Sequence, residues 1–541
     1  MHGLMMGYPL TIPVILRRAA EVYSEKEIVS RLNDGTVGRT NYGAFYGRVV
    51  RLMNALRDLG VGPGDRVATF AWNSQFHLEL YFAVPSIGAI LHTVNPRLFP
   101  EQIQFIIRHA EDRLLFLDRS LAAPIASLES SMPSIERYVV MDDRGPEPAD
   151  MPASSLDYEV LLASAPETED FPDLDERAAA GLCYTSGTTG EPKGVLYSHR
   201  STYLHAMGAC MVDSFGISER ETVLPVVPMF HANAWGLPYA CAMTGAKQVF
   251  AGAHTLGGPL WELIESEQVT IGAGIPMVWH LLYEHVKQHS RSFSTLHTIG
   301  CGGSAVPRSL IDAYARDFGV TMLSAWGMTE LSPVGSICRL RGSMRGWTLE
   351  RQLTQRAKQG PSVPGVELRI VDDQGQYLLH NGSQSGELVA RGPWVAEEYF
   401  KGDGCENALT PEGWFRTGDI ATIDGYGFVE ITDRKKDMIK SRGEWISSAD
   451  MEKTVLDHPE VREAAVVGRS DKTRGEVPVL FVVLSDGAKL DTVAGQILDQ
   501  LNSRFAKWQL PKRSDIRCVP TLPKTSVGKL DKKVLRTGLG E

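Results

Sequence analysis

The sequence predicts an α/β protein whose body contains largely parallel sheets, and two patterns lead to this prediction. Helical periodicity of apolar residues recurs at 42–59, 101–109, 260–267 and 278–289. Short apolar runs that are typical of strands lie among these segments, at 66–70, 114–117, 138–141 and 248–250. Because helices alternate with strands along the chain, each helix can serve as a crossover between parallel strands.

The pattern of apolar segments and turn residues changes near residue 363. Short β-type runs at 367–371, 386–390 and 427–431 are separated by Gly, Asp and Asn turns, which predicts a small antiparallel β subdomain over about 363–432. A compact charged run follows, and beyond it helical patterns at 449–456 and 492–505 alternate with strand-like runs at 463–468 and 477–484. We therefore expect an N-terminal domain at 1–432, a hinge at 433–437 and a C-terminal α+β domain at 438–541.

The composition excludes one broad class of function. The 541 residues carry a formal net charge of −10, whereas a nucleic-acid-binding protein needs a basic face, so no nucleic-acid partner is expected. With 43% hydrophobic and 22% charged residues, the chain has the profile of a soluble globular protein that is long enough for more than one domain.

Cysteine spacing and the N-terminal segment predict the compartment. The seven cysteines are scattered, odd in number and without metal-ligand or CxxC spacing, so we expect reduced thiols in a cytoplasmic protein and no zinc site. The first seven residues lack a basic region, which argues against a signal peptide. The most apolar segment, 80–94, is broken by Pro85 and is too short to cross a bilayer, although a peripheral contact with a membrane stays open.

The most informative segment of the chain is 184–194, which reads YTSGTTGEPKG and follows the apolar run 180–183. A strand followed by such a loop can surround an anion with backbone N–H groups, hydroxyls and a lysine. A Walker loop requires Gly directly before the Lys and Ser or Thr directly after it, whereas Pro192 and Gly194 flank Lys193 here. The segment therefore predicts a nucleotide phosphate loop of another kind.

Further motifs follow the phosphate loop: SAWGMTE at 324–330, GWFRTGD at 413–419, DRKK at 433–436 and PKTSVGK at 523–529. Their order and spacing resemble those of the adenylate-forming superfamily of acyl-CoA synthetases, luciferases and peptide-synthetase adenylation domains, over nearly the whole chain. The segments PMFHANAW at 228–235 and GEWISS at 443–448 look most like those of bacterial medium- and long-chain fatty-acyl-CoA synthetases and of methylmercaptopropionate-CoA ligases.

This resemblance implies an AMP-forming acid–CoA ligase. It implies a large N-terminal domain with two mostly parallel, helix-flanked sheets and the β subdomain, followed by a mobile C-terminal domain. In the implied reaction, a carboxylate oxygen attacks the α-phosphate of ATP to give an acyl-adenylate and pyrophosphate, and the thiol of CoA then takes the acyl group. ATP and CoA are the implied co-substrates, Mg²⁺ the implied cofactor, and a homodimer the implied assembly.

The resemblance also assigns residues to the nucleotide. Lys529, Glu330 and Thr185 form the implied catalytic set, in which Thr185 and Glu330 bind Mg²⁺ and the Lys529 ammonium bridges the carboxylate and the α-phosphate. Asp419, with Arg434 beside it, accepts hydrogen bonds from the ribose hydroxyls. The implied ATP and AMP contacts are Thr185, Ser186, Gly187, Thr188, Thr189, Gly190, Lys193, Gly302, Gly303, Ser304, Ala305, Ala325, Trp326, Gly327, Met328, Thr329, Glu330, Asp419, Arg434, Lys440 and Lys529.

Two positions depart from the pattern of the relatives. Trp326 stands where many of them have Tyr, so a flat ring for adenine stacking is kept while a hydroxyl is lost. Arg442 stands where the fatty-acyl subgroup usually has a second glycine, and its side chain can point to water or to a CoA phosphate.

The remaining implied contacts concern the acid and CoA. His231, Ala232, Trp235, Gly302 and Pro333 would surround the acid. Trp235 matches a residue that gates the fatty-acid tunnel of long-chain relatives, although core packing explains a buried Trp equally well. Gly443, Glu444 and Trp445 would line the CoA channel after the C-terminal domain has rotated about the hinge residue Lys436.

Several functions stay open from the sequence. The leading one is ligation of a medium- or long-chain fatty acid to CoA. The alternatives are a CoA ligase for a short or aromatic acid such as 3-methylmercaptopropionate, an acyl-adenylate-forming enzyme that does not use CoA, and a non-catalytic nucleotide-binding protein. The chain length of the acid stays open because one methylene changes binding by only about 1–3 kcal/mol.

Overall fold

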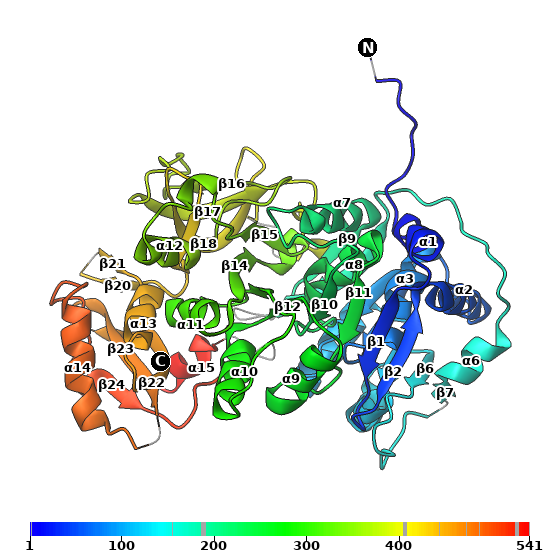
Figure 1. Cartoon of the computed structure of the whole chain (residues 1–541), viewed down its shortest axis with the longest axis horizontal. Coiled ribbons are helices and arrows are strands. Elements are labelled where there is room, and N and C mark those ends of the chain that lie inside the picture. The colour runs from blue at the N-terminus through cyan, green and yellow to red at the C-terminus, as the bar shows by residue number, and fades with distance from the viewer. Residues whose placement is uncertain are drawn as a thin grey trace.

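The computed structural model describes residues 1, 3–153, 155–185, 191–403, 408–442, 444–471, 473–485, 487–524 and 530–539. Within them the chain forms two large sheets, a four-stranded sheet and a separate C-terminal sheet. In Figure 1 the small sheet and the C-terminal region lie to one side of the two large sheets, and the N-terminal residues extend away from the body.

The first large sheet has the strand order β7-β6-β5-β3-β4-β8-β9. All neighbours are parallel except β8 and β9, which run antiparallel and flank the predicted phosphate loop. The strands are β3 (Arg66–Phe70), β4 (Ile90–Thr93), β5 (Leu114–Asp118), β6 (Arg137–Met141), β7 (Ser155–Asp157), β8 (Ala179–Tyr184) and β9 (Gly194–Ser198).

The second large sheet has the order β15-β14-β13-β12-β10-β11-β1-β2 and is parallel except at its two ends. Its strands are β1 (Glu27–Arg31), β2 (Val37–Asn41), β10 (Thr222–Pro225), β11 (Lys247–Phe250), β12 (Ile271–Gly274), β13 (Thr298–Cys301), β14 (Thr321–Gly327) and β15 (Val334–Ile337). The predicted pair of mostly parallel, helix-flanked sheets is therefore confirmed.

Helices fill the space between the two sheets and cover their outer faces. The inner helices are α1 (Ile12–Val22), α2 (Tyr42–Asp58), α3 (Gln75–Ser86), α7 (His199–Cys210) and α8 (Leu237–Thr244), and they share one hydrophobic core with both sheets. The outer helices are α9 (Gly257–Ser266), α10 (Pro276–Gln288) and α11 (Arg308–Phe318) on the second sheet, and α4 (Pro100–Ala110) and α5 (Ala122–Leu128) on the first. Two shorter helices, α6 (Tyr158–Ser164) and α12 (Leu349–Arg356), complete this part.

Local sequence explains where the inner helices begin. The side chain of Asn41 accepts a hydrogen bond from the Ala44 N–H at the start of α2, and Ser74 does the same for His77 at the start of α3. Helix α3 is buried on every side, which is why the apolar segment 80–94 reads as uniformly hydrophobic; it continues into β4. None of the helices in the described residues is both long enough and apolar enough to cross a membrane.

The β subdomain is an antiparallel meander of β16 (Glu367–Val371), β17 (Ser385–Arg391), β18 (Phe415–Ile423) and β19 (Val429–Arg434). The sequence patterns anticipated all of these strands but β18, whose Gly and Asp residues resemble a turn. β18 was missed because it contains Gly418. This glycine takes a left-handed φ of +71° inside the strand, a conformation that is more typical of a turn. Asp419 therefore lies on a strand and not in a turn.

The C-terminal region packs its own helices on an antiparallel sheet that gains one parallel strand at its edge. Its elements are β20 (Ile439–Ser441), β21 (Glu444–Ile446), α13 (Ser448–Leu456), β22 (Val461–Asp471), β23 (Gly475–Leu484), α14 (Leu490–Asn502), β24 (Ile516–Cys518) and α15 (Lys532–Thr537). The helix expected at 492–505 ends earlier, at Asn502, and the other expected elements match within a few residues.

Buried histidines give the folded N-terminal part a defined pH dependence. Burial lowers the pKa of His77, His199 and His205 to about 4. Between pH 6.5 and 4 the unfolded chain therefore binds protons that the folded chain does not, so stability is lost as pH falls through this window. Each histidine contributes about 1.4 kcal/mol per pH unit there.

We predict that His199→Asn reduces this pH dependence. The Asn oxygen can still accept the Ile12 N–H that His199 Nδ1 accepts, but the side chain cannot be protonated. Urea unfolding at pH 7.5 and 5.5 should show a smaller loss of stability in the variant than in the wild type. The exposed His289→Asn is the control, and equal pH dependence in the wild type and His199→Asn would contradict the prediction.

Candidate active site

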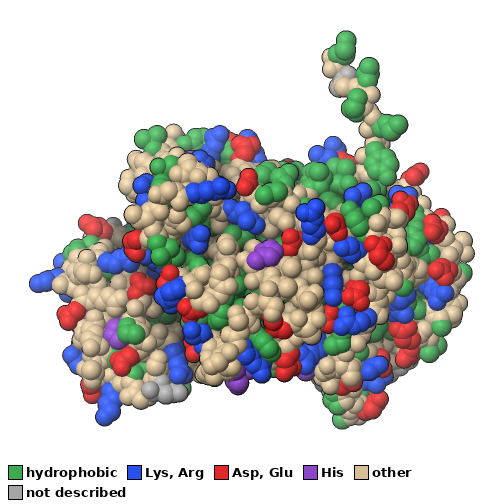
Figure 2. All heavy atoms as spheres, in the orientation of Figure 1, with side chains coloured by type: hydrophobic (Ala, Val, Ile, Leu, Met, Phe, Trp, Pro, Cys, Tyr) green, Lys and Arg blue, Asp and Glu red, His purple; other side chains and the backbone are tan. Residues whose placement is uncertain are grey.

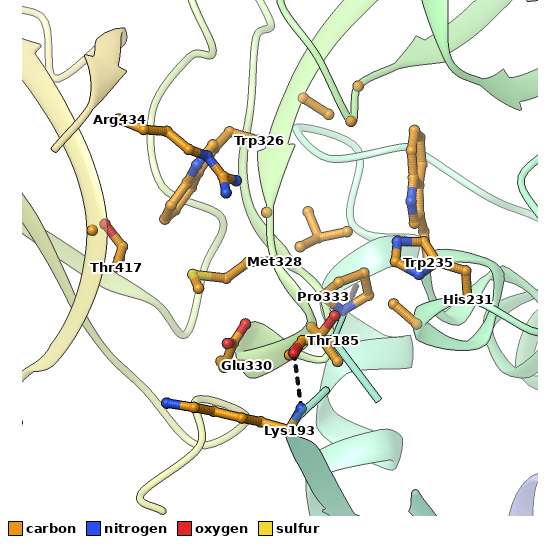
Figure 3. A pocket seen from close by; sticks show the side chains of 18 of the residues that line it. Thr185, Lys193, His231, Trp235, Trp326, Met328, Glu330, Pro333, Thr417 and Arg434 are labelled. Carbon is orange, nitrogen blue, oxygen red and sulfur yellow. Dashed lines mark hydrogen bonds between the residues drawn. The ribbon is translucent and has the colours of Figure 1, made fainter. Parts of the chain in front are cut away.

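A cavity of about 570 Å³ lies where the two large sheets and the β subdomain meet. Its lining comes from loops at the carboxyl ends of the parallel strands β10, β12, β13 and β14, from the end of β8, and from β18 and the segment after β19. Ligands of α/β sheets bind at this edge because several loops converge there. In Figure 3, Trp326, Arg434 and Thr417 lie on one side of the cavity, and His231 and Trp235 on the other.

Two hydrogen bonds join the ends of the predicted phosphate loop at one wall of the cavity. Thr185 donates its N–H to the Lys193 carbonyl at 2.9 Å, and the Thr185 hydroxyl accepts the Lys193 N–H at 3.2 Å (Figure 3). Both residues line the cavity. The intervening Ser186, Gly187, Thr188, Thr189 and Gly190 lie outside the described residues.

Tyr399 connects the phosphate-loop lysine to the predicted metal ligand. Its hydroxyl donates to Glu330 Oε1 at 2.7 Å, and its ring faces Lys193, whose Nζ lies 4.7 Å from the ring centroid. Glu330 is buried in a 3₁₀ turn directly after β14, and its own carbonyl accepts the Ala396 N–H at 2.7 Å. One tyrosine thus holds a carboxylate and a cation at the same wall.

The nucleoside side of the cavity is built around Trp326. The indole Nε1–H donates to Asp419 Oδ2 at 2.8 Å, and Arg434 Nε lies 3.3 Å from Asp419 Oδ1. Asp419 is buried next to Gly418, which lines the cavity. Replacing Tyr by Trp at 326 therefore changes the donor as well as the ring, because the indole N–H contacts the carboxylate that is predicted to bind ribose.

Gly302 and Gly303 bring the backbone close to this site. A Cβ at Gly302 would lie 2.8 Å from the Ala325 carbonyl oxygen, and Gly303 has a φ of +83°, so both positions require glycine. The glycines line the cavity together with Ala325, Gly327, Met328 and Thr329.

The opposite side of the cavity, around Trp235, is apolar. The backbone of the turn that forms it has an unusual conformation. All the residues of the turn Ala232–Gly236 have left-handed φ values, between 42° and 70°. Left-handed backbone costs roughly 1 kcal/mol or more for each non-glycine residue, so tertiary contacts must hold it. Asn233 Oδ1 supplies one such contact by accepting the Cys183 Sγ–H at 3.3 Å.

This turn places predicted acid contacts on the cavity wall. His231, Ala232, Trp235, Gly302 and Pro333 all line it, together with the apolar side chains of Val227, Pro228, Ile275 and Val334. Trp235 is 9% exposed, and its ring would lie 3.4 Å from a Cβ at Gly302. The side chain is therefore both packed and part of the wall.

Paired charges fix the segment that leads into the C-terminal region. The buried Glu387 accepts hydrogen bonds from Arg416 at 2.8 Å and from Lys435 at 3.2 Å, and all three residues line the cavity. Lys436 also lines the cavity, and burial lowers its pKa. On the far side of this segment, Arg536 of α15 binds Asp437 at 2.7 Å.

The described flanks of the lysine loop at 523–529 lie beside the start of α10. Lys524 pairs with Leu530 as a β-bridge, and the Lys524 ammonium lies 3.6 Å from Met277 Sδ at the start of α10. Met277 follows Ile275, which lines the cavity, by two residues. Lys529 itself lies outside the described residues.

Some predicted residues lie elsewhere in this arrangement. Ser304 and Ala305 are exposed beyond β13, and Gly443 is outside the described residues. Lys440 and Trp445 form a cation–π pair at 5.2 Å on the β20–β21 hairpin, and neither they nor Glu444 line the cavity. Arg442 in this hairpin has a φ of +53°, which glycine adopts more easily.

Eleven described residues that line the cavity were not among the predicted site residues: Glu191, Val227, Pro228, Ile275, Val334, Glu387, Tyr399, Arg416, Thr417, Gly418 and Lys435. Arg416, Thr417 and Lys435 stand inside the quoted motifs, so a closer reading of those motifs could have found them. Glu387 and Tyr399 carried no comparable signal, because their partners are distant in sequence.

Two family models match this sequence. One, described as AMP-binding enzyme, covers residues 16–400, and the other, described as AMP-binding enzyme C-terminal domain, covers residues 450–529. The first match spans more than half of the chain. The protein therefore belongs to the family of AMP-binding enzymes, and the predicted membership of the adenylate-forming superfamily is confirmed.

Three curated relatives narrow the class further. The chain is 44% identical to a long-chain-fatty-acid–CoA ligase of Thermus thermophilus, over 98% of this chain and 96% of the relative. It is 41% identical to a 3-methylmercaptopropionyl-CoA ligase of Ruegeria lacuscaerulensis over 99% and 98%, and to a medium-chain-fatty-acid–CoA ligase of Ectopseudomonas oleovorans over 100% and 98%. The predicted enzyme class, an AMP-forming acid–CoA ligase, is confirmed.

A solved structure supports the fold. A crystal structure of an anthranilate CoA ligase in complex with anthranoyl-AMP superposes with a TM-score of 0.86 at 24% identity, covering 99% of this chain and 98% of that one. At this identity the likeness shows that the two proteins share the fold.

We predict that Tyr399→Phe lowers kcat/KM for ATP about tenfold, because Glu330 loses a hydroxyl donor while the ring beneath Lys193 remains. AMP release at varied ATP concentration measures this. Tyr377→Phe is the matched control, since the Tyr377 hydroxyl makes no hydrogen bond within the described part of the chain. Equal activity of Tyr399→Phe and the control would show that the hydroxyl does not position Glu330.

Proposed function

We propose that this protein joins a medium- or long-chain fatty acid to CoA with the consumption of ATP. The main support for the proposal is a single cavity whose three walls differ in chemical character. A lysine, a hydroxyl and a carboxylate form the phosphate wall, Trp326 with Asp419 and Arg434 forms the nucleoside wall, and the side around Trp235 is apolar. Such a cavity can hold an acid against the α-phosphate of ATP.

In the first step, a carboxylate oxygen of the acid attacks the α-phosphorus. The bond from this phosphorus to the bridging oxygen of pyrophosphate breaks, and pyrophosphate leaves with the electron pair. Lys193 and the 185–190 loop hold the leaving group, so that negative charge is stabilised where it develops. Lys529 is assigned to the attacking carboxylate and the α-phosphate, and the contact between Lys524 and Met277 supports its approach to the cavity.

The donor set of this site suits Mg²⁺. Thr185 and Glu330 offer hydroxyl and carboxylate oxygens on the same wall, and Mg²⁺ favours such hard ligands and keeps several of its waters. These two residues would hold the ion, which neutralises phosphate charge when bound. Tyr399 orients the Glu330 carboxylate for this role.

In the second step, the sulfur of the CoA thiolate attacks the acyl carbon of the adenylate, and AMP leaves with the bridging oxygen and its electron pair. The thiol proton passes to solvent. This step needs a path for CoA, and we assign Gly443, Glu444 and Trp445 to that path after rotation of domain 438–541 about Lys436. The exposed position of Trp445, 49% accessible, fits the arrangement that precedes this rotation.

The proposed acid follows from the apolar side and from the relatives. Apolar side chains around His231 and Trp235 suit an aliphatic tail, and relatives named for long- and medium-chain fatty acids share 41 to 44% identity. A short thioether acid is the second candidate, because a 3-methylmercaptopropionyl-CoA ligase is also 41% identical to this chain.

We further propose a cytoplasmic homodimer. Residues 3–9 extend from the body as an arm, and Met1, Leu4, Met5, Met6 and Tyr8 are exposed (Figure 1). Hydrophobic side chains gather along this arm in Figure 2. An apolar arm of this kind supports association through the N-terminal domain. The scattered, unpaired cysteines of the sequence support a reducing compartment.

A ligation screen tests the proposed function. Acids from C3 to C18, 3-methylmercaptopropionate and aromatic acids are incubated with ATP, Mg²⁺ and CoA, and AMP and thioester are quantified. Thioester formation that is greatest with C8–C18 acids supports the proposal, and a maximum at 3-methylmercaptopropionate selects the second candidate. Full turnover without CoA, or no pyrophosphate exchange with any acid, would overturn it.

We predict that Lys529→Ala lowers pyrophosphate exchange by about 100-fold or more, because it removes the cation that bridges the two anions. Thioester formation from a synthetic acyl-adenylate and CoA should change little. Lys524→Ala is the matched control on the same loop. Equal loss in both half-reactions would contradict the assignment of Lys529 to adenylation.

We predict that Glu330→Gln raises the Mg²⁺ concentration required for half-maximal pyrophosphate exchange about tenfold, since a neutral amide replaces the carboxylate ligand. Titration with MgCl₂ at fixed ATP measures this change. Glu221→Gln, at a carboxylate remote from the cavity, is the control. An unchanged Mg²⁺ requirement would remove Glu330 from the metal site.

A further inference from the structure

The hydrogen bond between Trp326 and Asp419 joins two separate parts of the fold. Trp326 lies on β14 of a large sheet, and Asp419 lies on β18 of the β subdomain. The 2.8 Å contact between indole Nε1 and Oδ2 is buried. The other carboxylate oxygen, Oδ1, faces Arg434 Nε at 3.3 Å.

These two partners of Asp419 differ in how firmly they are held. Trp326 is 8% exposed, and its ring is packed so closely that a Cβ at Gly335 would lie 2.5 Å from it. The Arg434 side chain is 45% exposed. A packed indole has a fixed position, whereas an exposed arginine can move when a ligand enters.

The Asp419 carboxylate can accept further hydrogen bonds from a ribose. An ionised carboxylate accepts about four hydrogen bonds, and Trp326 uses one position on Oδ2 while Arg434 forms an ion pair with Oδ1. The 2′- and 3′-hydroxyls of a ribose can use the remaining positions if the carboxylate keeps its orientation. Without the indole N–H, the carboxylate can rotate about its terminal torsion, which has only a weak intrinsic preference.

We propose that Trp326 is a positioning residue that sets ribose recognition: its indole N–H fixes Asp419 so that the enzyme distinguishes ribonucleotides from deoxyribonucleotides. This inference rests on the proposed assignment of Asp419 to the ribose and adds a role to Trp326 beyond a stacking surface. The role belongs to the indole nitrogen, which a phenylalanine ring lacks.

Binding of AMP, 2′-deoxy-AMP and 3′-deoxy-AMP tests the proposal by calorimetry. For Trp326→Phe we expect AMP affinity to fall on the order of tenfold, as for the loss of a hydrogen bond to a charged group. The affinities for the deoxy analogues should fall less, so that the preference for AMP over each analogue shrinks. Trp261→Phe is the matched control, because it also removes an indole hydrogen bond, to the Ser292 carbonyl, far from the cavity.

A double-mutant cycle separates positioning from stacking. In an Asp419→Ala background, Trp326→Phe should no longer change the ratio of AMP to 2′-deoxy-AMP affinity. A uniform loss for all three nucleotides, or the same loss with and without Asp419, would overturn the proposal in favour of stacking alone. If the Phe variant melts below the assay temperature, Trp326→Leu, which offers no hydrogen-bond donor, replaces it. Its loss of stacking lowers all three affinities alike, so the same change in the affinity ratios is expected.

Because the test measures only nucleotide binding, its outcome does not depend on which acid the enzyme activates. If the wild type binds AMP with a preference over its deoxy analogues but activates no acid, the proposed function fails and the inference on Trp326 stands. If Asp419→Ala leaves that preference intact, the ribose assignment fails and the inference fails with it.

Discussion

The arrangement of side chains around the cavity depends on the unfavourable free energy of burying carboxylates. Glu330, Glu387 and Asp419 are all buried at or beside the cavity that is proposed to hold ATP. An ionised carboxylate that is removed from water without partners costs several kcal/mol, so each needs donors or cations within reach. These carboxylates therefore fix the positions of the side chains that pair with them around the cavity.

Each buried carboxylate uses partners from a different part of the chain. Glu330 binds the Tyr399 hydroxyl, Glu387 binds Arg416 and Lys435, and Asp419 binds Trp326 and Arg434. These bonds connect the end of a large sheet to the β subdomain and to the segment that precedes the C-terminal region. The charged side chains around the cavity are consequently held in place by one another, as the proposed reaction requires.

The sequence predicted much of this arrangement because its strongest signals are local. Alternation of helix and strand predicted the parallel sheets, and the motifs around Thr185, Glu330, Asp419 and Arg434 predicted parts of two cavity walls. The strand β18 escaped prediction because a left-handed glycine interrupts it. Glu387 and Tyr399 escaped because their roles depend on partners 29 or more residues away in the chain.

The sequence alone determined the class of the protein, since the order and spacing of its short motifs already resemble those of the adenylate-forming enzymes. Only the tertiary structure decided how these parts act on one another. Trp326 seemed to lose a hydroxyl, but its indole N–H binds Asp419 across two sheets. The left-handed turn that places Trp235 is also stable only because distant side chains hold it. Both features depend on long-range contacts, for which local sequence patterns carry no signal.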